Sequence, residues 1–184
     1  MSVKTERSQD GGNVLSGKKV IVLAEDLYED LELWYPVLRL REAGAKVTIV
    51  GTGAKEYRGK HGYPVEADTS INDVRAGDFD ALVVPGGYAP DRLRRYQKVL
   101  DLVREMNDAG KPIGAICHAP WVLISAGVLR HRKLTCFHSI KDDVRNAGGE
   151  YMDSEVVRDA NLVTSRQPSD LGAFCRELIV AVEG

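Results

Sequence analysis

The residue best suited to chemistry is Cys117, which lies in the segment GAICHAP. An apolar run ends at this cysteine, and a helical pattern begins directly after it without a loop. A sharp strand-to-helix turn of this kind presents a side chain above the sheet at a helix N-terminus, where unpaired N–H groups favour a thiolate. The pattern therefore predicts that Cys117 is a nucleophile and partly ionised at neutral pH.

Backbone amides near this cysteine are candidates for holding an oxyanion. His118 follows the cysteine, and Gly86 and Gly87 end another predicted strand. Glycine permits close backbone approach, so we expect the N–H groups of His118, Gly86 and Gly87 to stabilise negative charge on a substrate oxygen. The imidazole of His118 has two interpretations: it moves protons, or it is a core side chain and only its N–H takes part.

The remaining cysteines and the histidines indicate no metal centre. Cys136 and Cys175 fall in apolar patterns and are interpreted as core residues. The three cysteines are widely spaced, which suits free thiols in a reducing compartment. The four histidines show no metal-ligand spacing, and neither a Walker A motif nor a dinucleotide fingerprint occurs. We therefore expect no metal and no cofactor.

Short β-branched runs alternate with helical patterns from residue 18 onward. Such alternation predicts an α/β fold, a doubly wound and mostly parallel sheet with helices on both faces. Ligands of these sheets bind at the carboxyl ends of the strands, where Cys117 and the two glycines are expected. The predicted strands are 18–24, 45–51, 80–87, 111–117, 133–137 and 161–164, with a hairpin at 56–68; the predicted helices are 30–43, 99–106, 118–127, 140–147 and 170–182.

Length and composition limit the functional classes. The chain has 184 residues, of which 43% are hydrophobic and 28% charged, as in an ordinary globular protein. We predict one α/β domain over 18–184, preceded by a flexible, polar tail over 1–17. A net charge of −2 gives no global attraction to nucleic acid. No apolar run is long enough for a membrane span or a signal peptide, so we expect a cytoplasmic protein that binds neither membrane nor nucleic acid.

Several motifs in one order resemble a known family. They begin at residue 28 and reach residue 170: YEDLELWYP, GKHGYPV, DALVVPGGYAPD, ICHAP, SAGVLRHRKLT, IKDDVRNAG and VTSRQPSD. The sequence is similar to the PfpI family, the intracellular cysteine protease and amidase branch of the DJ-1/PfpI superfamily. The resemblance covers residue 19 to nearly the C-terminus and implies a class I glutamine amidotransferase-like, flavodoxin-like fold with a nucleophile elbow.

The resemblance implies a role for four residues. Cys117 matches the nucleophile, and His118 matches the histidine of the catalytic triad. Glu29 matches the acid that shares a hydrogen bond with the sulfur, although a carboxylate that merely complements a helix dipole is the alternative. Asp91 matches a carboxylate that orients the histidine of the adjacent subunit, or else it is a solvated helix cap. Asp91 replaces the family's glutamate and is one methylene shorter, which lengthens or removes that contact.

The family also implies candidate functions. The first is a stress-related, cofactor-independent cysteine hydrolase with deglycase-like or glyoxalase-like action on methylglyoxal or glyoxal adducts. The same residues suit a peptidase or amidase. A different class is a redox sensor or chaperone that uses an oxidisable Cys117. The implied partners are small carbonyl compounds or modified proteins and peptides as substrates, and further copies of the chain in a homodimer or larger homo-oligomer.

Overall fold

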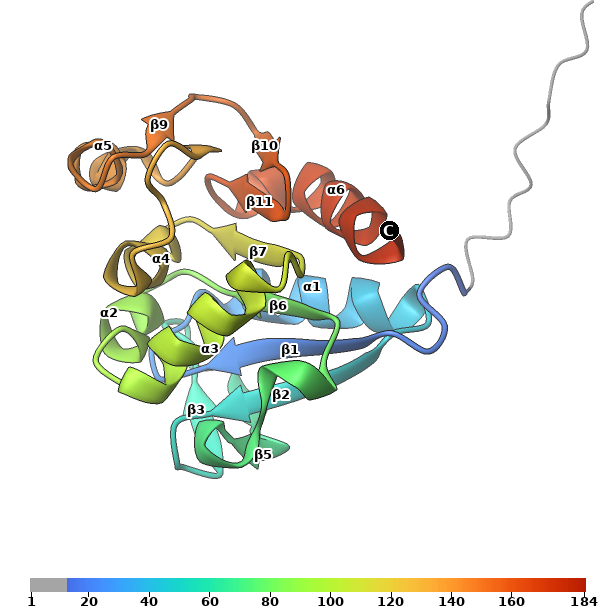
Figure 1. Cartoon of the computed structure of the whole chain (residues 1–184). Helices are drawn as coiled ribbons and strands as arrows, with labels where there is room; N and C mark the ends of the chain where they lie inside the picture. The colour runs from blue at the N-terminus through green and yellow to red at the C-terminus, as the bar shows by residue number, and fades with distance from the viewer. Residues whose placement is uncertain (1–12) are drawn as a thin grey trace, which may run out of the picture.

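Seven strands form the central sheet of the computed structural model, which describes residues 13–184 (Figure 1). Their order is β10-β11-β7-β6-β1-β2-β5, and every neighbouring pair is parallel except β10 with β11. The strands are β1 (Lys19–Ala24), β2 (Lys46–Gly51), β5 (Thr69–Ser70), β6 (Ala81–Val84), β7 (Ile113–Ile116), β10 (Val156–Asp159) and β11 (Leu162–Ser165). The predicted α/β class and mostly parallel sheet are confirmed.

Helices cover both faces of this sheet (Figure 1). On one face α1 packs against α6, and on the other α4 packs against α2 and α3, with α5 beside α4. The helices are α1 (Asp30–Glu42), α2 (Ala89–Leu93), α3 (Gln97–Asp108), α4 (Pro120–Ala126), α5 (Lys141–Asn146) and α6 (Leu171–Glu183). Four short 3₁₀ helices lie at Ile71–Asp73, Ala76–Asp78, His138–Ile140 and Pro168–Asp170.

Two small sheets lie outside the main one. β3 (Glu56–Arg58) and β4 (Pro64–Glu66) form the predicted antiparallel hairpin. β8 (Lys133–Leu134) pairs with β9 (Glu150–Tyr151). The strand predicted over 133–137 is therefore present but covers only Lys133–Leu134, and it lies outside the main sheet. The edge strand β10 was not predicted, because its residues alternate between buried and solvent-facing positions and lack a continuous apolar run.

The proposed boundary of the flexible tail also needs correction. Residues 1–12 lie outside the described residues. Leu15, however, is fully buried, and its N–H donates to the carbonyl of Ala43 at 2.8 Å. It belongs to a hydrophobic core that extends to Val182. The packed part of the chain therefore begins before residue 18. Among the described helices, none has the length and apolar character needed to cross a membrane.

Candidate active site

Cys117 occupies a strained turn at the carboxyl end of β7. Its φ angle is 63°, in the left-handed region that residues other than glycine rarely adopt. Such strain costs on the order of 1–3 kcal/mol and persists only where the surroundings hold it. Here the N–H of Cys117 donates to the carbonyl of Ser165 at 3.0 Å, and its carbonyl accepts from the N–H of Phe137 at 3.0 Å. These two hydrogen bonds hold the backbone of Cys117 in the predicted elbow conformation.

The cysteine side chain borders a small cavity. It is 8% exposed, and the cavity volume is about 290 Å³. We call this cavity the thiol cavity. Its lining comes from the start of α1, the β3–β4 loop, the segments after β6 and β7, the segment after β8 and the short helix after β11: Glu29, Glu32, Lys60, Gly87, Tyr88, Cys117, His118, Phe137 and Pro168. The site thus lies at the carboxyl edge of the sheet, as expected for a parallel α/β fold.

The carboxyl group that interacts with the sulfur belongs to Glu32, not to Glu29. Glu32 is fully buried, and its Oε2 accepts a hydrogen bond from the N–H of Gly86 at 3.0 Å. Oε1 has no partner of good hydrogen-bond geometry among the described residues, and the thiol of Cys117 is the side chain that interacts with this carboxyl. The predicted role of Glu29 as the partner of the sulfur is therefore wrong.

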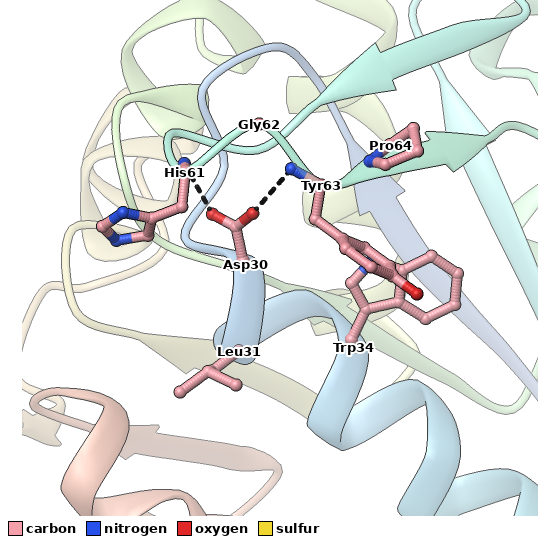
Figure 2. A pocket seen from close by; sticks show the side chains of 7 residues that line it. All are labelled: Asp30, Leu31, Trp34, His61, Gly62, Tyr63 and Pro64. Carbon is pink, nitrogen blue, oxygen red and sulfur yellow. Dashed lines mark hydrogen bonds between the residues drawn. The ribbon is translucent and has the colours of Figure 1, made fainter.

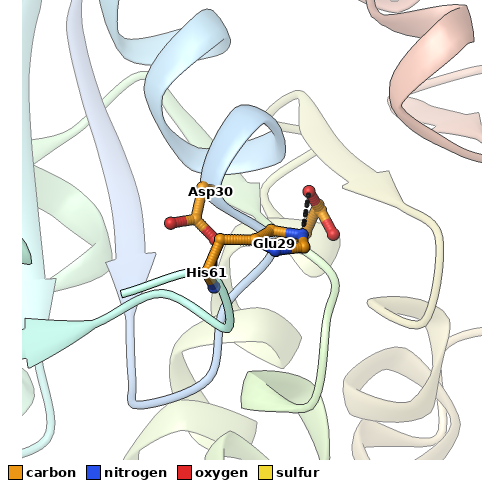
Figure 3. A group of neighbouring side chains, drawn as sticks. All are labelled: Glu29, Asp30 and His61. Atoms are coloured by element: carbon orange, nitrogen blue, oxygen red, sulfur yellow. Dashed lines mark hydrogen bonds and ion pairs between the residues drawn. The ribbon is translucent and has the colours of Figure 1, made fainter. Parts of the chain in front are cut away.

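Glu29 lies at the wall of the thiol cavity and makes different contacts. It directly precedes α1, and its Oε2 lies 2.5 Å from Nζ of Lys60. The ring of His61 also faces it, with Nε2 at 3.9 Å from Oε1 (Figure 3). Glu29 and Glu32 are three residues apart, so both reach the cavity from the start of the helix. Which of the two meets the sulfur depends on how α1 docks on the sheet.

A sequence signal for Glu32 was available. Glu32, Pro36 and Leu40 are spaced by four residues and are all buried along one stripe of α1. A carboxylate on an otherwise apolar stripe is rare unless it has a partner or a function. Pro36 belongs to the same buried stripe and lies inside the helix without ending it.

Burial keeps a proton on Glu32. Removal from water raises the pKa of this carboxyl to about 8, and the negative charge of Glu29 contributes in the same direction. The interaction with the Cys117 thiol and the hydrogen bond from the N–H of Gly86 oppose the rise. At neutral pH, Glu32 is therefore mainly a neutral acid that can donate a hydrogen bond.

The resting sulfur differs from the expected thiolate. Burial raises the pKa of the Cys117 thiol, and charge on Glu32 would raise it further. The N–H groups of Gly87 and His118 act in the opposite direction but do not compensate. The expected support from a helix N-terminus is also missing, because α4 begins only at Pro120 and Cys117 is not in its first turn. A base must therefore remove the thiol proton.

His118 is placed to act as that base. Its Nδ1 lies 3.2 Å from the sulfur of Cys117, and its Nε2 lies 3.3 Å from the hydroxyl oxygen of Ser139. The ring stacks on Phe137 with centroids 5.1 Å apart and meets the edge of Trp121 at 5.0 Å. Burial lowers the pKa of His118, and the positive charge of Lys60 lowers it further. A neutral imidazole beside a neutral thiol can accept the proton.

The two strand-end glycines have different roles. The N–H of Gly86 is already bonded to Glu32, so the prediction that it serves the oxyanion is wrong. The N–H groups of Gly87 and His118 point to the sulfur region and remain available there. A Cβ on Gly86 would lie 2.3 Å from Oε2 of Glu32 and 2.6 Å from Cβ of Cys117. Glycine at this position therefore lets the carboxyl of Glu32 and the side chain of Cys117 approach each other closely.

Asp91 is not brought to His118 within the chain. It lies in α2, where its carboxylate pairs with Arg95. The expected contact concerns an adjacent subunit and stays a prediction. Cys136 and Cys175 are 0% and 1% exposed, in agreement with their interpretation as core residues.

The β3–β4 loop and a groove lie next to the thiol cavity. Asp30 accepts hydrogen bonds from the N–H groups of His61, at 3.0 Å, and Tyr63, at 3.1 Å (Figure 2). Beside them lies a groove of about 510 Å³ whose apolar walls include Trp34 and Tyr63. Ligand atoms of Glu29, Asp30 and His61 lie within 4.8 Å of one another. Backbone amides bind the carboxylate of Asp30, and Lys60 binds that of Glu29. The negative charges of this group are therefore compensated by the protein itself.

Comparison with known proteins finds relatives over nearly the whole chain. The DJ-1/PfpI family model matches residues 18–181. The chain is 49% identical over 161 residues to Deglycase PH1704 of Pyrococcus horikoshii, and the match covers 88% of this chain and 97% of that protein. It is 41% identical over 170 residues to General stress protein 18 of Bacillus subtilis, covering 91% and 99%. Drosophila melanogaster DJ-1beta superposes with a TM-score of 0.85 at 33% identity, covering 91% of each chain.

These matches span nearly the whole relatives, and one of them carries the name of an enzyme. They confirm the interpretation of the chain as an enzyme, without testing the roles of individual residues. The chain belongs to the DJ-1/PfpI family.

Proposed function

We propose that the protein is a cysteine hydrolase that removes early glyoxal or methylglyoxal adducts from amino or thiol groups. The observation that carries this proposal is the arrangement around one sulfur. Cys117 borders a cavity, with His118 Nδ1 at 3.2 Å as a base and the N–H groups of Gly87 and His118, which interact with the sulfur, as oxyanion donors. The name of the relative Deglycase PH1704 supports the choice of reaction.

The chemistry needs no external oxidant. His118 takes the thiol proton, and the sulfur bonds to the carbon that carries the amine and a hydroxyl group, so that the amine leaves with a proton. A hydrogen shift then oxidises this carbon to a thioester while the neighbouring carbonyl becomes an alcohol. Water cleaves the carbon–sulfur bond, which restores the thiol and releases a hydroxy acid. One water is consumed for each adduct, and amine and hydroxy acid are the products.

Glu32 supports the sulfur during this sequence. A protonated carboxyl in a buried position donates a hydrogen bond to the negative charge that develops on sulfur, without adding a repelling charge. Its bond from Gly86 fixes the carboxyl at the required place. The cavity of about 290 Å³ suits a small carbonyl group better than several residues of an extended peptide, which favours adduct removal over peptide hydrolysis.

The test is turnover of a methylglyoxal adduct of N-acetyllysine or N-acetylcysteine, followed by release of the free amine or thiol and of lactate. We expect the wild-type protein to release both products in equal amounts and Cys117→Ala to release neither. Cys175→Ala is the matched control, since Cys175 is buried in α6 and does not line the thiol cavity. No turnover by the folded wild type, or equal turnover by Cys117→Ala, contradicts the proposal.

A redox function is the second candidate, and Glu32 favours it. Its Oε1 has no hydrogen-bond partner of good geometry among the described residues, and the group carries a proton at neutral pH. A sulfinic acid formed on Cys117 by peroxide would offer oxygen acceptors to that proton. Mild peroxide should oxidise Cys117 well before Cys136 and Cys175, and equal oxidation of the three contradicts this function.

Self-association and a cytoplasmic location complete the proposal. Apolar side chains of α1 face solvent, with Leu31 57% and Leu38 59% exposed, which supports burial against a second copy. The three cysteines are free, as expected in a reducing compartment. Light scattering of the wild type and of Leu38→Asp should show a dimer or larger assembly that the substitution weakens. A monomeric wild type contradicts this part.

A further inference from the structure

Lys60 is the one cationic side chain among the described residues that line the thiol cavity. Its Nζ lies 2.5 Å from Oε2 of Glu29, and 37% of its side chain remains exposed. The carboxylate is nearly inaccessible, with 8% of its side chain exposed. Glu29 therefore fixes the direction of the ammonium group, while part of the lysine side chain stays exposed. An ammonium group has three N–H donors, and one ion pair does not occupy them all.

The backbone around Lys60 is held on several sides. The N–H of Lys60 donates to the carbonyl of Tyr28 at 2.8 Å. On its C-terminal side, Asp30 accepts the N–H groups of His61 and Tyr63 (Figure 2). The N–H of Gly59 donates to the carbonyl of Tyr63 at 2.9 Å, which closes the loop. A lysine on a surface loop usually moves freely, whereas this one is presented from a closed and anchored turn.

Hydrogen-bond donors of two kinds therefore line the thiol cavity. The N–H groups of Gly87 and His118 interact with the sulfur, and Lys60 lines the same cavity from the β3–β4 loop. Electrostatic effects of this ammonium group reach both Cys117 and His118. The cavity thus provides two separate places for oxygen atoms of one small molecule.

We propose that Lys60 is a specificity-determining residue that binds a second, partly or fully negative oxygen on the carbon next to the one attacked by Cys117. This inference rests on the proposed function and gives its substrates a common feature, two oxygens on neighbouring carbons. The amides hold the oxygen of the attacked carbon, and Lys60 holds the other. The substrate class is then an α-oxo or α-hydroxy carbonyl compound, including the hydroxy acid product, rather than a simple ester or amide.

A purely structural role for Lys60 predicts something different. An ion pair at a partly exposed site stabilises a fold by about 0.2–1 kcal/mol, so its loss would affect all substrates alike through small changes of the loop. A substrate-binding role predicts selectivity. A charge-assisted hydrogen bond contributes about 1.5–3 kcal/mol, which corresponds to roughly a 10- to 150-fold change in kcat/KM for compounds that use it.

Alkylation of Cys117 tests the inference without requiring turnover. Iodoacetate carries a carboxylate next to the reacting carbon, whereas iodoacetamide is neutral and similar in size. In both reactions the sulfur–carbon bond forms and iodide leaves. We expect Lys60→Gln to slow the alkylation of Cys117 by iodoacetate about 10-fold or more relative to iodoacetamide. Lys60→Arg should restore most of the ratio, and Lys55→Gln, an exposed lysine outside the cavity, should leave it unchanged.

Turnover supplies the second readout. For the methylglyoxal adduct, Lys60→Gln should raise KM and weaken inhibition by lactate. An unchanged alkylation ratio in Lys60→Gln, or an equal loss of rate with both reagents, overturns the inference. A wild type that shows the predicted alkylation ratio but does not process the adduct contradicts the proposed function alone, because the anion site is then present without that reaction.

Discussion

Glu32 and Gly86 form the contact that organises the thiol cavity. Oε2 of the buried carboxyl accepts the N–H of Gly86 at 3.0 Å, and a Cβ on this glycine would overlap the carboxyl oxygen and the Cys117 side chain. The end of β6, the first turn of α1 and the elbow after β7 thus meet at one position without a side chain. The acid, the nucleophile and the backbone donors all depend on this close approach.

Gly86→Ala should damage both stability and activity. The added methyl group would lie 2.3 Å from Glu32 Oε2, so the acid or the elbow must shift. We expect a loss of about 1–3 kcal/mol in the free energy of unfolding and a large loss of kcat, measured by urea denaturation and adduct turnover. Gly77→Ala is the control, because a Cβ added at Gly77 would meet nothing within 4 Å among the described residues. Similar behaviour of the two variants would show that the contact is not needed.

The proton on Glu32 predicts a pH limit for activity. With a pKa of about 8, the carboxyl loses its proton as pH rises through that value and then repels negative charge on sulfur. The kcat of the wild type should therefore fall on the alkaline side of about pH 8. Glu32→Gln keeps a hydrogen-bond donor without ionising, so its profile should lack this decline. An identical alkaline decline in both proteins assigns it to another group.

The same group predicts a pH dependence of stability. The folded pKa of about 8 lies above the ordinary value of 4.5, so the folded state keeps a proton that the unfolded state loses. The stability that this group contributes is fully present below about pH 4.5 and is lost as pH rises to about 8; the loss is on the order of 5 kcal/mol. Urea denaturation between about pH 5 and 8 should show this decline in the wild type and a smaller one in Glu32→Gln. The exposed Glu56→Gln serves as control.

His118→Ala tests the base. A neutral imidazole at 3.2 Å from the sulfur should increase the rate by roughly 10²- to 10⁴-fold through proton transfer, and the variant should lose this factor in kcat. Ser139→Ala removes only the contact to Nε2 and should have a much smaller effect. Full activity of His118→Ala would mean that the thiol loses its proton by another route.

Asp91→Asn tests the predicted contact across an interface. In the chain itself Asp91 pairs with Arg95, and His118 Nε2 already contacts Ser139. If a second subunit supplies Asp91 to His118, the variant should lose activity roughly 10-fold while keeping its oligomeric state, as checked by light scattering. If Asp91→Asn keeps both the kcat and the oligomeric state of the wild type, Asp91 takes no part in catalysis.

The amino-acid sequence by itself determined the alternation of strands and helices along most of the chain, the family and the elbow at Cys117, the predicted nucleophile. These depend on local patterns: an apolar strand that ends at Cys117, glycines at the end of β6 and helical spacing in between. The direct passage from strand to helix at Cys117 can be recognised in one short segment of the sequence, because it does not depend on contacts with distant residues.

The tertiary structure alone decided the partners of that nucleophile. Glu29 and Glu32 are both acids at the start of α1, and only the docking of this helix on the sheet brings Glu32 to the sulfur and leaves Glu29 to Lys60. The docking of α1 also brings the carboxyl of Glu32 to the N–H of Gly86, which donates a hydrogen bond to it. The thiol of Cys117 is buried in the folded chain, and this burial raises its pKa instead of lowering it. Burial and long-range hydrogen bonds depend on residues far apart in the chain, and no local pattern contains them.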